Sequence, residues 1–372
     1  MKSVGLYIHI PFRVYKINHR NVISYYNKDF YIDNYFKALK KELFLRKNDS
    51  FLIDSIYFGG GDPSSLNSDY VVDILEYIRE NYNVKENCEI SVEINPICPD
   101  FRLVNYVKFG FNRFSIKVFT FDKKGLQNLA ILHDRRNIKD VLKILEKSKI
   151  SNINLDMYFM YPGQTLKTLK EDLEILNKLK VPHISYYCYQ DDHDVEGEKL
   201  PVCEEIDHSE LKDKMLEAIS NTLINFGYNH YEINHFEKNG YKSYHNQKYW
   251  NMDEYLAVGI GATGFINNIL YKNVTEFEEY FSKIKNEELP ILEEEELSSE
   301  DLEKNYIISR MGLDEGIDIE TINSKFKINF LEKYKKEIRK NIDIDILEIK
   351  DNHVKFTNHG KYYSNEFYMD II

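Results

Sequence analysis

The chain has 372 residues, of which 43% are hydrophobic, and a formal net charge of −12 at pH 7. This length suffices for one large domain and a smaller one, and no apolar run reaches the length of a transmembrane helix. The acidic balance argues against nucleic acid as the main partner, because binding phosphate backbones requires a positive surface. Four cysteines without a CxxC pair and an N-terminus without a signal-peptide pattern predict a soluble, cytoplasmic protein with reduced thiols.

The first predicted strand ends at Pro11, which has no N–H to donate to a sheet. The residues before it alternate between the two faces of a strand, with Leu6, Ile8 and Ile10 on one face and Tyr7 and His9 on the other. A polar loop over residues 13–20 follows directly. We therefore expect this strand to open an α/β active site.

Five further strands and the helices between them follow in regular alternation. Strands are predicted at residues 55–58, 89–94, 113–118, 153–159 and 183–190, and helices at 32–43, 69–81, 124–131, 137–147 and 166–179, with a short one before Gly110. This β-then-α order predicts a parallel sheet with crossover helices.

In each predicted strand, one set of alternate residues is apolar and the other set is polar. The polar set comprises Tyr7, His9, Ser55, Tyr57, Glu89, Ser91, Glu93, Ser115, Lys117, Asn154, Asp156, Ser185, Tyr187 and Tyr189. A parallel sheet covered on both faces should be apolar on both, and a closed (β/α)8 barrel is filled with branched aliphatic side chains. We therefore predict an incomplete (β/α)6 barrel whose polar inner face holds a polar ligand.

The rest of the chain is predicted to close the barrel and to form a small α+β domain of winged-helix type. We expect a helix near residues 211–226, a strand at 231–233, a solvated linker at Glu293–Glu296, a helix beginning near Ser298, and a strand pair at 342–349 and 353–356. The predicted divisions are residues 1–228 for the partial barrel, 229–292 for the closing segment and 297–372 for the C-terminal domain.

Three short motifs resemble those of one family. Residues 7–12 read Tyr-Ile-His-Ile-Pro-Phe, residues 59–64 read Gly-Gly-Gly-Asp-Pro-Ser, and residues 245–250 read His-Asn-Gln-Lys-Tyr-Trp. Together they resemble the radical S-adenosylmethionine (SAM) proteins of the HemN/HemW type, the oxygen-independent coproporphyrinogen oxidases and heme chaperones. The resemblance covers nearly the whole chain and implies an open (β/α)6 barrel.

The resemblance implies a SAM pocket on the polar inner face. The residues that it assigns to this pocket are Tyr7, Gly59, Gly60, Gly61, Glu93 and Asp156. As carboxylates, Glu93 and Asp156 could hold an amine or a ribose. The alternative is that they form structural ion pairs with Lys117 or Arg113.

Several positions depart from the family's pattern at this pocket. Lys117 and Met160 stand where the family has glycines, and Asp62 stands where it has a threonine. Phe119 replaces a glutamine, and Ile131 replaces an arginine that is expected to contact the SAM carboxylate. Nearly all of these changes put a bulky, charged or apolar residue in place of a small or polar one. SAM binding in the family's manner is therefore doubtful.

The three cysteines that bind a four-iron cluster in the family are absent here. The places of its CxxxCxxC motif are held by Arg13, Ile17 and Arg20. A four-iron cluster needs thiolate ligands held close together, and an arginine has no lone pair to offer. We predict that the cluster is absent and that no metal is bound. The run Asp191-Asp192-His193-Asp194 is interpreted as a solvated loop.

The motif His245-Asn246-x-x-Tyr249-Trp250 resembles the heme-chaperone branch of the family. Imidazole is a heme iron ligand, and Tyr249 with Trp250 would offer an aromatic wall. The alternative is that His245 and Asn246 are buried hydrogen-bonding residues that fix the segment closing the barrel.

Three functions remain open from the sequence. The first is a degenerate HemW-like protein that binds or handles heme or another tetrapyrrole, whose propionates the basic loop with Arg13 and Arg20 could contact. The second is an enzyme in which Lys117, Arg13 or Arg20 serves a non-radical, or an unrecognised SAM-dependent, reaction in the same lumen. The third is a non-catalytic scaffold whose C-terminal domain binds a protein partner.

Overall fold

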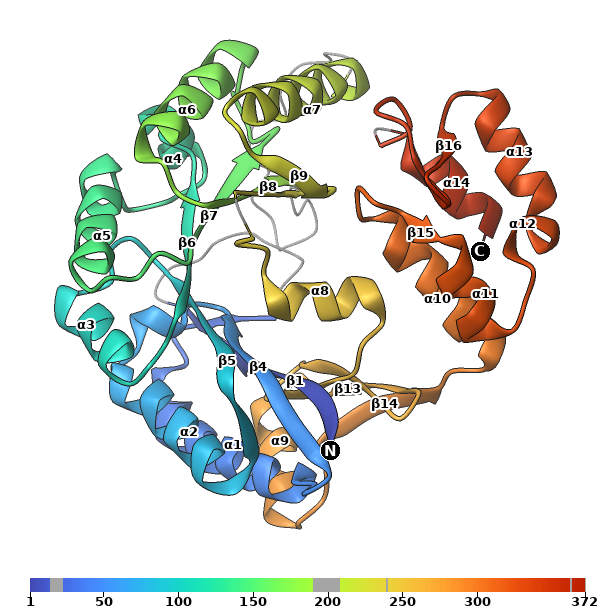
Figure 1. The fold of residues 1–372 in the computed structure, drawn as a ribbon. Coiled ribbons are helices and arrows are strands. Elements are labelled where there is room, and N and C mark those ends of the chain that lie inside the picture. Colours follow the sequence, from blue (N-terminus) through green and yellow to red (C-terminus); the bar gives the residue numbers. More distant parts are fainter. Residues whose placement is uncertain (14–22, 190–207, 239, 362, 372) are drawn as a thin grey trace, which may run out of the picture.

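The computed structural model describes residues 1–13, 23–189, 208–238, 240–361 and 363–371 of the chain (Figure 1). Within these residues, no helix is long and apolar enough to cross a membrane. The predicted loop positions Ile17 and Arg20, the run Asp191–Asp194 and Cys203 lie outside the described residues.

The centre of the fold is a curved sheet of six parallel strands. In spatial order these are β1 (Lys2–Ile10), β4 (Phe51–Gly60), β5 (Asn83–Ile94), β6 (Arg113–Phe119), β7 (Ile153–Phe159) and β8 (His183–Cys188). Each pairs in parallel with the next. Figure 1 shows the helices on the outside of this sheet: α1 (Ile32–Arg46), α2 (Ser68–Asn81), α3 (Asp100–Lys108), α4 (Lys123–Asn128), α5 (Arg135–Lys147) and α6 (Leu166–Leu179). The predicted partial (β/α)6 barrel is confirmed.

The alternation along the strands separates an apolar layer from a polar inner face. Leu6, Ile8, Phe58, Ile116 and Leu155 are fully buried between the sheet and its helices. The alternate residues include most of the side chains that form the polar network described below. Apolar burial therefore fixes the register of the strands, because a slip of one residue would turn every side chain to the other face.

Additional strands extend both ends of the parallel sheet. Beyond β1 lie β11 (Tyr255–Val258), β12 (Thr263–Ile266), β13 (Ile269–Asn273) and β14 (Ile291–Glu296), and beyond β8 lie β10 (His235–Glu237) and β9 (Asn229–Glu232). Helices α7 (His208–Asn225), α8 (Tyr244–Asn251) and α9 (Phe277–Lys285) belong to the same part. Figure 1 shows α8 lying across the inside of the curved sheet.

The prediction of a linker at Glu293–Glu296 is wrong. These residues form most of the edge strand β14, which pairs with β13 in antiparallel register. Their side chains are exposed, and charged side chains are typical of edge strands because they discourage pairing with another chain. The run of charges therefore concealed a strand that is held in the sheet by backbone pairing with β13.

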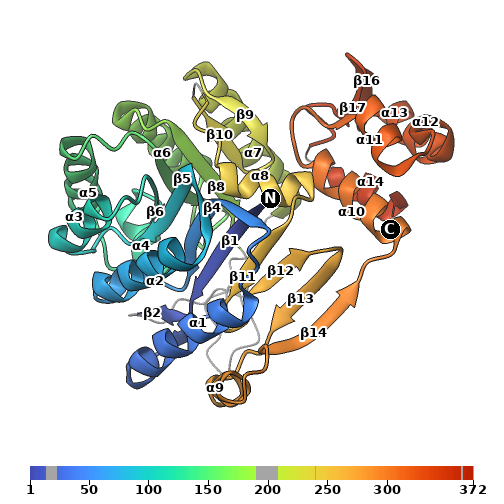
Figure 2. The ribbon, with the colours of Figure 1, turned by 60° about the horizontal axis from the view of Figure 1, so that its bottom comes forward.

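The C-terminal part has an apolar core of its own, with Ile307, Phe330 and Phe367 fully buried in it. Its elements are α10 (Ser299–Met311), β15 (Ile317–Asp318), α11 (Ile319–Phe326), α12 (Phe330–Lys333), α13 (Lys335–Asp343), β16 (Leu347–Lys350), β17 (His353–Phe356) and α14 (Ser364–Ile371). Figure 2 shows them grouped beside the large sheet, next to α8. The predicted domain boundaries remain a prediction.

Two details of this part bear on the sequence analysis. Ser298 caps α10 in a capping box with Asp301, so the predicted helix start is confirmed. The predicted strand at 342–349 begins only at Leu347, because α13 continues to Asp343. Amphipathic spacing alone did not distinguish the end of that helix from the start of the strand.

One buried carboxylate fastens α1 to the strands that extend the sheet. Glu42 is fully buried and accepts hydrogen bonds from Arg46 Nε at 2.8 Å, Asn273 Nδ2 at 2.8 Å, the Gly259 N–H at 2.8 Å and the Tyr280 hydroxyl at 2.7 Å. The Arg46 guanidinium is also nearly buried, so each group depends on the other for its charge balance.

We expect Glu42→Gln to lower the free energy of unfolding by about 3–5 kcal/mol, because it leaves the buried Arg46 guanidinium without a counter-charge. Urea denaturation compared with wild type measures this loss, and Glu295→Gln on the exposed edge strand is the matched control. A loss no larger than that of the control would show that the Glu42 network contributes little net stability.

Candidate functional site

The candidate site lies at the carboxyl ends of the parallel strands, where ligands bind in open α/β sheets. Strand β4 ends at Gly60, whose φ of +109° is one that side chains rarely adopt. The turn then returns to the sheet, with the Gly61 N–H donating to the Ile10 carbonyl at 2.8 Å and the Asp62 N–H to the Phe12 carbonyl at 2.7 Å. A Cβ on Gly59 would meet the Glu93 carboxylate at 3.0 Å. Only glycine therefore lets these groups approach so closely.

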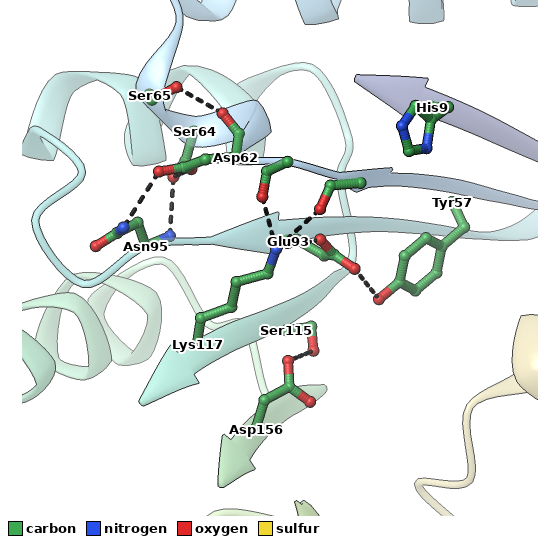
Figure 3. A network of polar contacts seen from close by, with 12 residues as sticks. His9, Tyr57, Asp62, Ser64, Ser65, Glu93, Asn95, Ser115, Lys117 and Asp156 are labelled. Atoms are coloured by element: carbon green, nitrogen blue, oxygen red, sulfur yellow. Dashed lines mark hydrogen bonds and ion pairs between the residues drawn. The ribbon is translucent and has the colours of Figure 1, made fainter. Parts of the chain in front are cut away.

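The Lys117 ammonium fills the space beside this turn. Its Nζ lies 2.7 Å from Glu93 Oε2 and donates to the Gly61 carbonyl at 2.8 Å and the Gly60 carbonyl at 3.3 Å (Figure 3). A primary ammonium has three N–H donors, and here each has an acceptor. We call the two carbonyls and the Glu93 carboxylate the ammonium cradle. The Lys117–Glu93 ion pair, which the sequence offered as one alternative for Glu93, is present.

Neighbouring groups hold the Glu93 side chain of the cradle. The Tyr57 hydroxyl donates to Glu93 Oε1 at 3.2 Å. Burial raises the pKa of Glu93, and the Lys117 ammonium opposes that rise. Because burial disfavours an isolated carboxylate, the ammonium and the carboxylate stabilise each other's charged forms.

Asp62 fastens the glycine-rich turn to the end of β5. Its carboxylate accepts from the Ser64 hydroxyl at 2.7 Å and from Asn95 Nδ2 at 3.1 Å, while the Asn95 N–H donates to the Ser64 oxygen at 2.8 Å. Figure 3 shows this set beside the cradle and separate from it. The carboxylate that the sequence analysis counted as an added charge in the pocket is used structurally.

Asp156 takes part in a second network on the inner face. It accepts from the Ser115 hydroxyl and from Asn154 Nδ2, both at 2.8 Å. Asn154 Oδ1 lies 2.6 Å from Nδ1 of the buried His183. Arg113 donates instead to Asn152 and to the Tyr241 carbonyl, so the alternative of an Asp156–Arg113 ion pair is not found.

Tyr7 and Tyr187 on the inner face each pair with a histidine. The Tyr7 hydroxyl lies 3.0 Å from His9 Nδ1, and the Tyr187 hydroxyl lies 3.1 Å from His235 Nε2. Sequence reasoning placed Tyr187 on the polar face but missed His235. No local signal marks His235, because it reaches the site through the antiparallel pairing of β10 with β8.

A small apolar cluster occupies positions where the family has polar SAM contacts. Phe119 and Ile131, the residues that stand for the family's glutamine and arginine, are buried together with Leu126, Leu129 and Tyr161. Phe119 has a φ of +64°, and its ring stacks on that of Tyr158 with centroids 4.5 Å apart. The two residues that differ from the family's pattern, Phe119 and Ile131, therefore pack in the same apolar cluster.

The residues that the structure describes do not fit a four-iron cluster. Among them there is no group of three or more His, Cys, Asp or Glu side chains placed to share a metal ion. Burial raises the pKa of Cys88 and of Cys98 to about 12 and also raises that of Cys188, so the free protein favours the thiol form at these positions. Arg13 lies at the end of β2 (Phe12–Arg13).

The His-Asn-x-x-Tyr-Trp motif forms the first turns of α8, and His245 in it is fully buried. His245 Nδ1 lies 2.9 Å from the Ser55 hydroxyl and Nε2 lies 2.8 Å from the Tyr249 hydroxyl, so both ring nitrogens are engaged. Burial lowers the pKa of His245 to about 3. This geometry is that of the alternative in which His245 fixes the closing segment.

The other two residues of the motif also have structural neighbours. The Asn246 N–H donates to the capping Ser243 hydroxyl at 3.2 Å. Trp250 packs toward the C-terminal part, where a Cβ on Gly312 would meet its ring at 3.3 Å. The motif thus links the inner face of the barrel to the C-terminal part.

Comparisons with known proteins agree with this architecture. The Radical SAM superfamily profile matches residues 26–176. The heme chaperone HemW of Buchnera aphidicola subsp. Schizaphis graminum is 34% identical over 294 residues, covering 74% of this chain and 76% of that protein. The heme chaperone HemW of Lactococcus lactis is 28% identical over 365 residues, covering 96% and 94%. The structure of coproporphyrinogen III oxidase (HemN) from Escherichia coli, a radical SAM enzyme, aligns with a TM-score of 0.85 at 18% identity, covering 100% of this chain and 90% of that one, which is a likeness of fold.

We expect the protein to lose stability on mild acidification. Burial lowers the pKa of His245 to about 3 and those of His9, His133 and His230 to about 4, from an ordinary value of 6.5. The unfolded chain therefore binds more protons, and the stability present above about pH 6.5 is lost as the pH falls toward about 4.

Urea denaturation at several pH values tests this expectation. His245→Gln should show a shallower decline of the unfolding free energy with falling pH, because it removes one of the groups that must stay neutral. The exposed His359→Gln should follow wild type. An unfolding free energy that does not change over this pH range would contradict the assignment.

Proposed function

The chain belongs to the HemW-like family of the radical SAM superfamily, and from this premise we propose that it handles heme or another tetrapyrrole without radical SAM chemistry. The relatives named above as heme chaperones support the choice of ligand. Residues of this chain itself support the loss of SAM chemistry. The tetrapyrrole is the cargo of the protein and is not a resident catalytic group.

The occupied ammonium cradle is the observation that carries the proposal. SAM contains an α-ammonium group, and the glycine-rich turn is where relatives contact its methionine moiety. In this chain the Lys117 ammonium already holds the carbonyls of Gly60 and Gly61 and the Glu93 carboxylate. A ligand ammonium would have to displace Lys117 and then lie beside a like charge, which is unfavourable.

Two further features support the same proposal. The cluster positions Arg13, Ile17 and Arg20 supply no thiolate. The packing of Phe119 and Ile131 in one apolar cluster removes the polar contacts that the family uses for the rest of SAM. Changes at three separate parts of one site thus all disfavour the family's reaction.

The enzyme alternative finds less support at Lys117. A lysine that acts as a nucleophile must be deprotonated, which requires surroundings that disfavour its charge. Lys117 lies instead against a carboxylate and two carbonyl oxygens, all of which stabilise the ammonium form. The scaffold alternative predicts no small-molecule ligand and is tested by the heme titration below.

Removing the Lys117 side chain should create a binding site for small primary ammonium ions. We expect n-propylammonium to raise the melting temperature of Lys117→Ala, because a ligand that binds only the folded state stabilises it by mass action. Wild type should not respond, since its cradle is filled. Tetramethylammonium, which has no N–H, and 1-propanol, which has no charge, are the controls. Equal responses of variant and wild type would show that the cradle does not select ammonium groups.

Wild-type protein should bind ferric heme at a saturable site. We expect a shift of the Soret band that saturates with heme, together with a higher melting temperature of the heme-bound protein. His245→Gln should retain the shift, because both ring nitrogens of His245 are already engaged by Ser55 and Tyr249.

Two outcomes of the titration would change this account. An unchanged heme spectrum with wild-type protein would refute the proposed function and leave the scaffold. Loss of the Soret shift in a folded His245→Gln variant would instead identify His245 as the iron ligand.

A further inference from the structure

A tyrosine, a histidine and a glutamate form a line from the inner face toward the C-terminal part. The pairing of β10 with β8 sets His235 opposite Ser185, and residues directly opposite in an antiparallel pair share a face. Tyr187 is two residues further along β8 and therefore on that same face. The line is thus built by strand register and does not depend on a mobile loop.

The hydrogen bonds along this line have a direction. Glu232 is 1% exposed, and its Oε2 accepts from the Asn234 N–H at 2.9 Å and from His235 Nδ1. Because the carboxylate holds the proton on Nδ1, His235 Nε2 presents a lone pair. The Tyr187 hydroxyl, 3.1 Å away, donates to that lone pair. Tyr187 is partly exposed, whereas His235 is 4% exposed.

The surroundings of Tyr187 are anionic. Burial raises the pKa of its hydroxyl, and the charges of Asp156, Glu232 and Glu93 add to that rise. The free protein therefore holds a neutral phenol there. The same negative charges favour a cationic centre, such as a ferric iron in a porphyrin, that could replace the phenol proton.

Tyr57 and Tyr7, two other tyrosines of the inner face, lack this arrangement. The Tyr57 hydroxyl donates to Glu93. Tyr7 pairs with His9, but the other nitrogen of His9 faces the neutral Ile23 carbonyl at 2.7 Å, and burial lowers the pKa of His9 to about 4. His9 therefore lacks the carboxylate that, at His235, accepts from Nδ1.

We propose, building on the proposed tetrapyrrole function, that the Tyr187 oxygen is the protein ligand of the ferric iron of bound heme. As the Fe–O bond forms, the phenol O–H bond breaks and its proton passes to His235 Nε2, where Glu232 balances the imidazolium. The iron stays ferric throughout. Tyrosine is an established axial ligand of heme iron, and an anionic oxygen donor favours the ferric over the ferrous state.

Resonance Raman and absorption spectra of the heme-bound protein test the assignment. Wild type should show iron–phenolate vibrations and the charge-transfer bands of a phenolate-ligated ferric heme. Tyr187→Phe should lose these signatures and bind heme about tenfold or more weakly, a loss of one axial bond. Tyr186→Phe, on the opposite face of the same strand, is the matched control and should behave as wild type.

Two further variants keep the test decisive if Tyr187→Phe folds poorly. Tyr187→His should replace the phenolate signature by that of an imidazole-ligated heme, which happens only if this position reaches the iron. His235→Gln should keep the phenolate signature with weaker binding, because the phenol proton loses its acceptor.

The outcomes separate this inference from the proposed function. If wild type binds heme without a phenolate signature, Tyr187 is not the iron ligand, but tetrapyrrole binding stands. The same holds if the signature is lost in Tyr7→Phe and kept in Tyr187→Phe. Wild type that binds no heme would overturn both.

Discussion

The ion pair between Lys117 and Glu93 is the interaction on which the account of the site depends. It joins β6 to β5 and, through the carbonyls of Gly60 and Gly61, to the end of β4. The glycine-rich turn, which would otherwise receive the ammonium group of a ligand, thus binds the ammonium group of Lys117. The same ammonium balances the charge of the Glu93 carboxylate within the protein itself.

Local alternation in the sequence predicted most of the fold and part of the site. The alternating polar residues of the strands predicted that Glu93, Lys117 and Asp156 share the inner face, because a strand turns alternate residues to the same side. Two features of the structure were not predicted. His235 enters the site through pairing between distant strands, and Glu293–Glu296 form an edge strand whose charges mimic a linker. Both depend on backbone pairing, which leaves little mark on composition.

The motif at residues 245–250 illustrates how a family pattern and its local geometry can separate. His245 is engaged at both nitrogens by Ser55 and Tyr249, and Trp250 faces the C-terminal part. The His245–Ser55 contact fastens α8 to the inside of the barrel, and Trp250 joins α8 to the C-terminal part. We place the proposed iron contact instead at Tyr187, whose hydroxyl lies 3.1 Å from His235 Nε2, with the Glu232 carboxylate behind that histidine.

We infer that the barrel keeps the family's fold but has lost its four-iron cluster and its chemistry with SAM. Anaerobic incubation of the purified protein with iron, sulfide and reductant, followed by addition of SAM, tests it most directly. We expect no stoichiometric iron–sulfur cluster and no cleavage of SAM to 5′-deoxyadenosine. A stoichiometric four-iron cluster that cleaves SAM would contradict it.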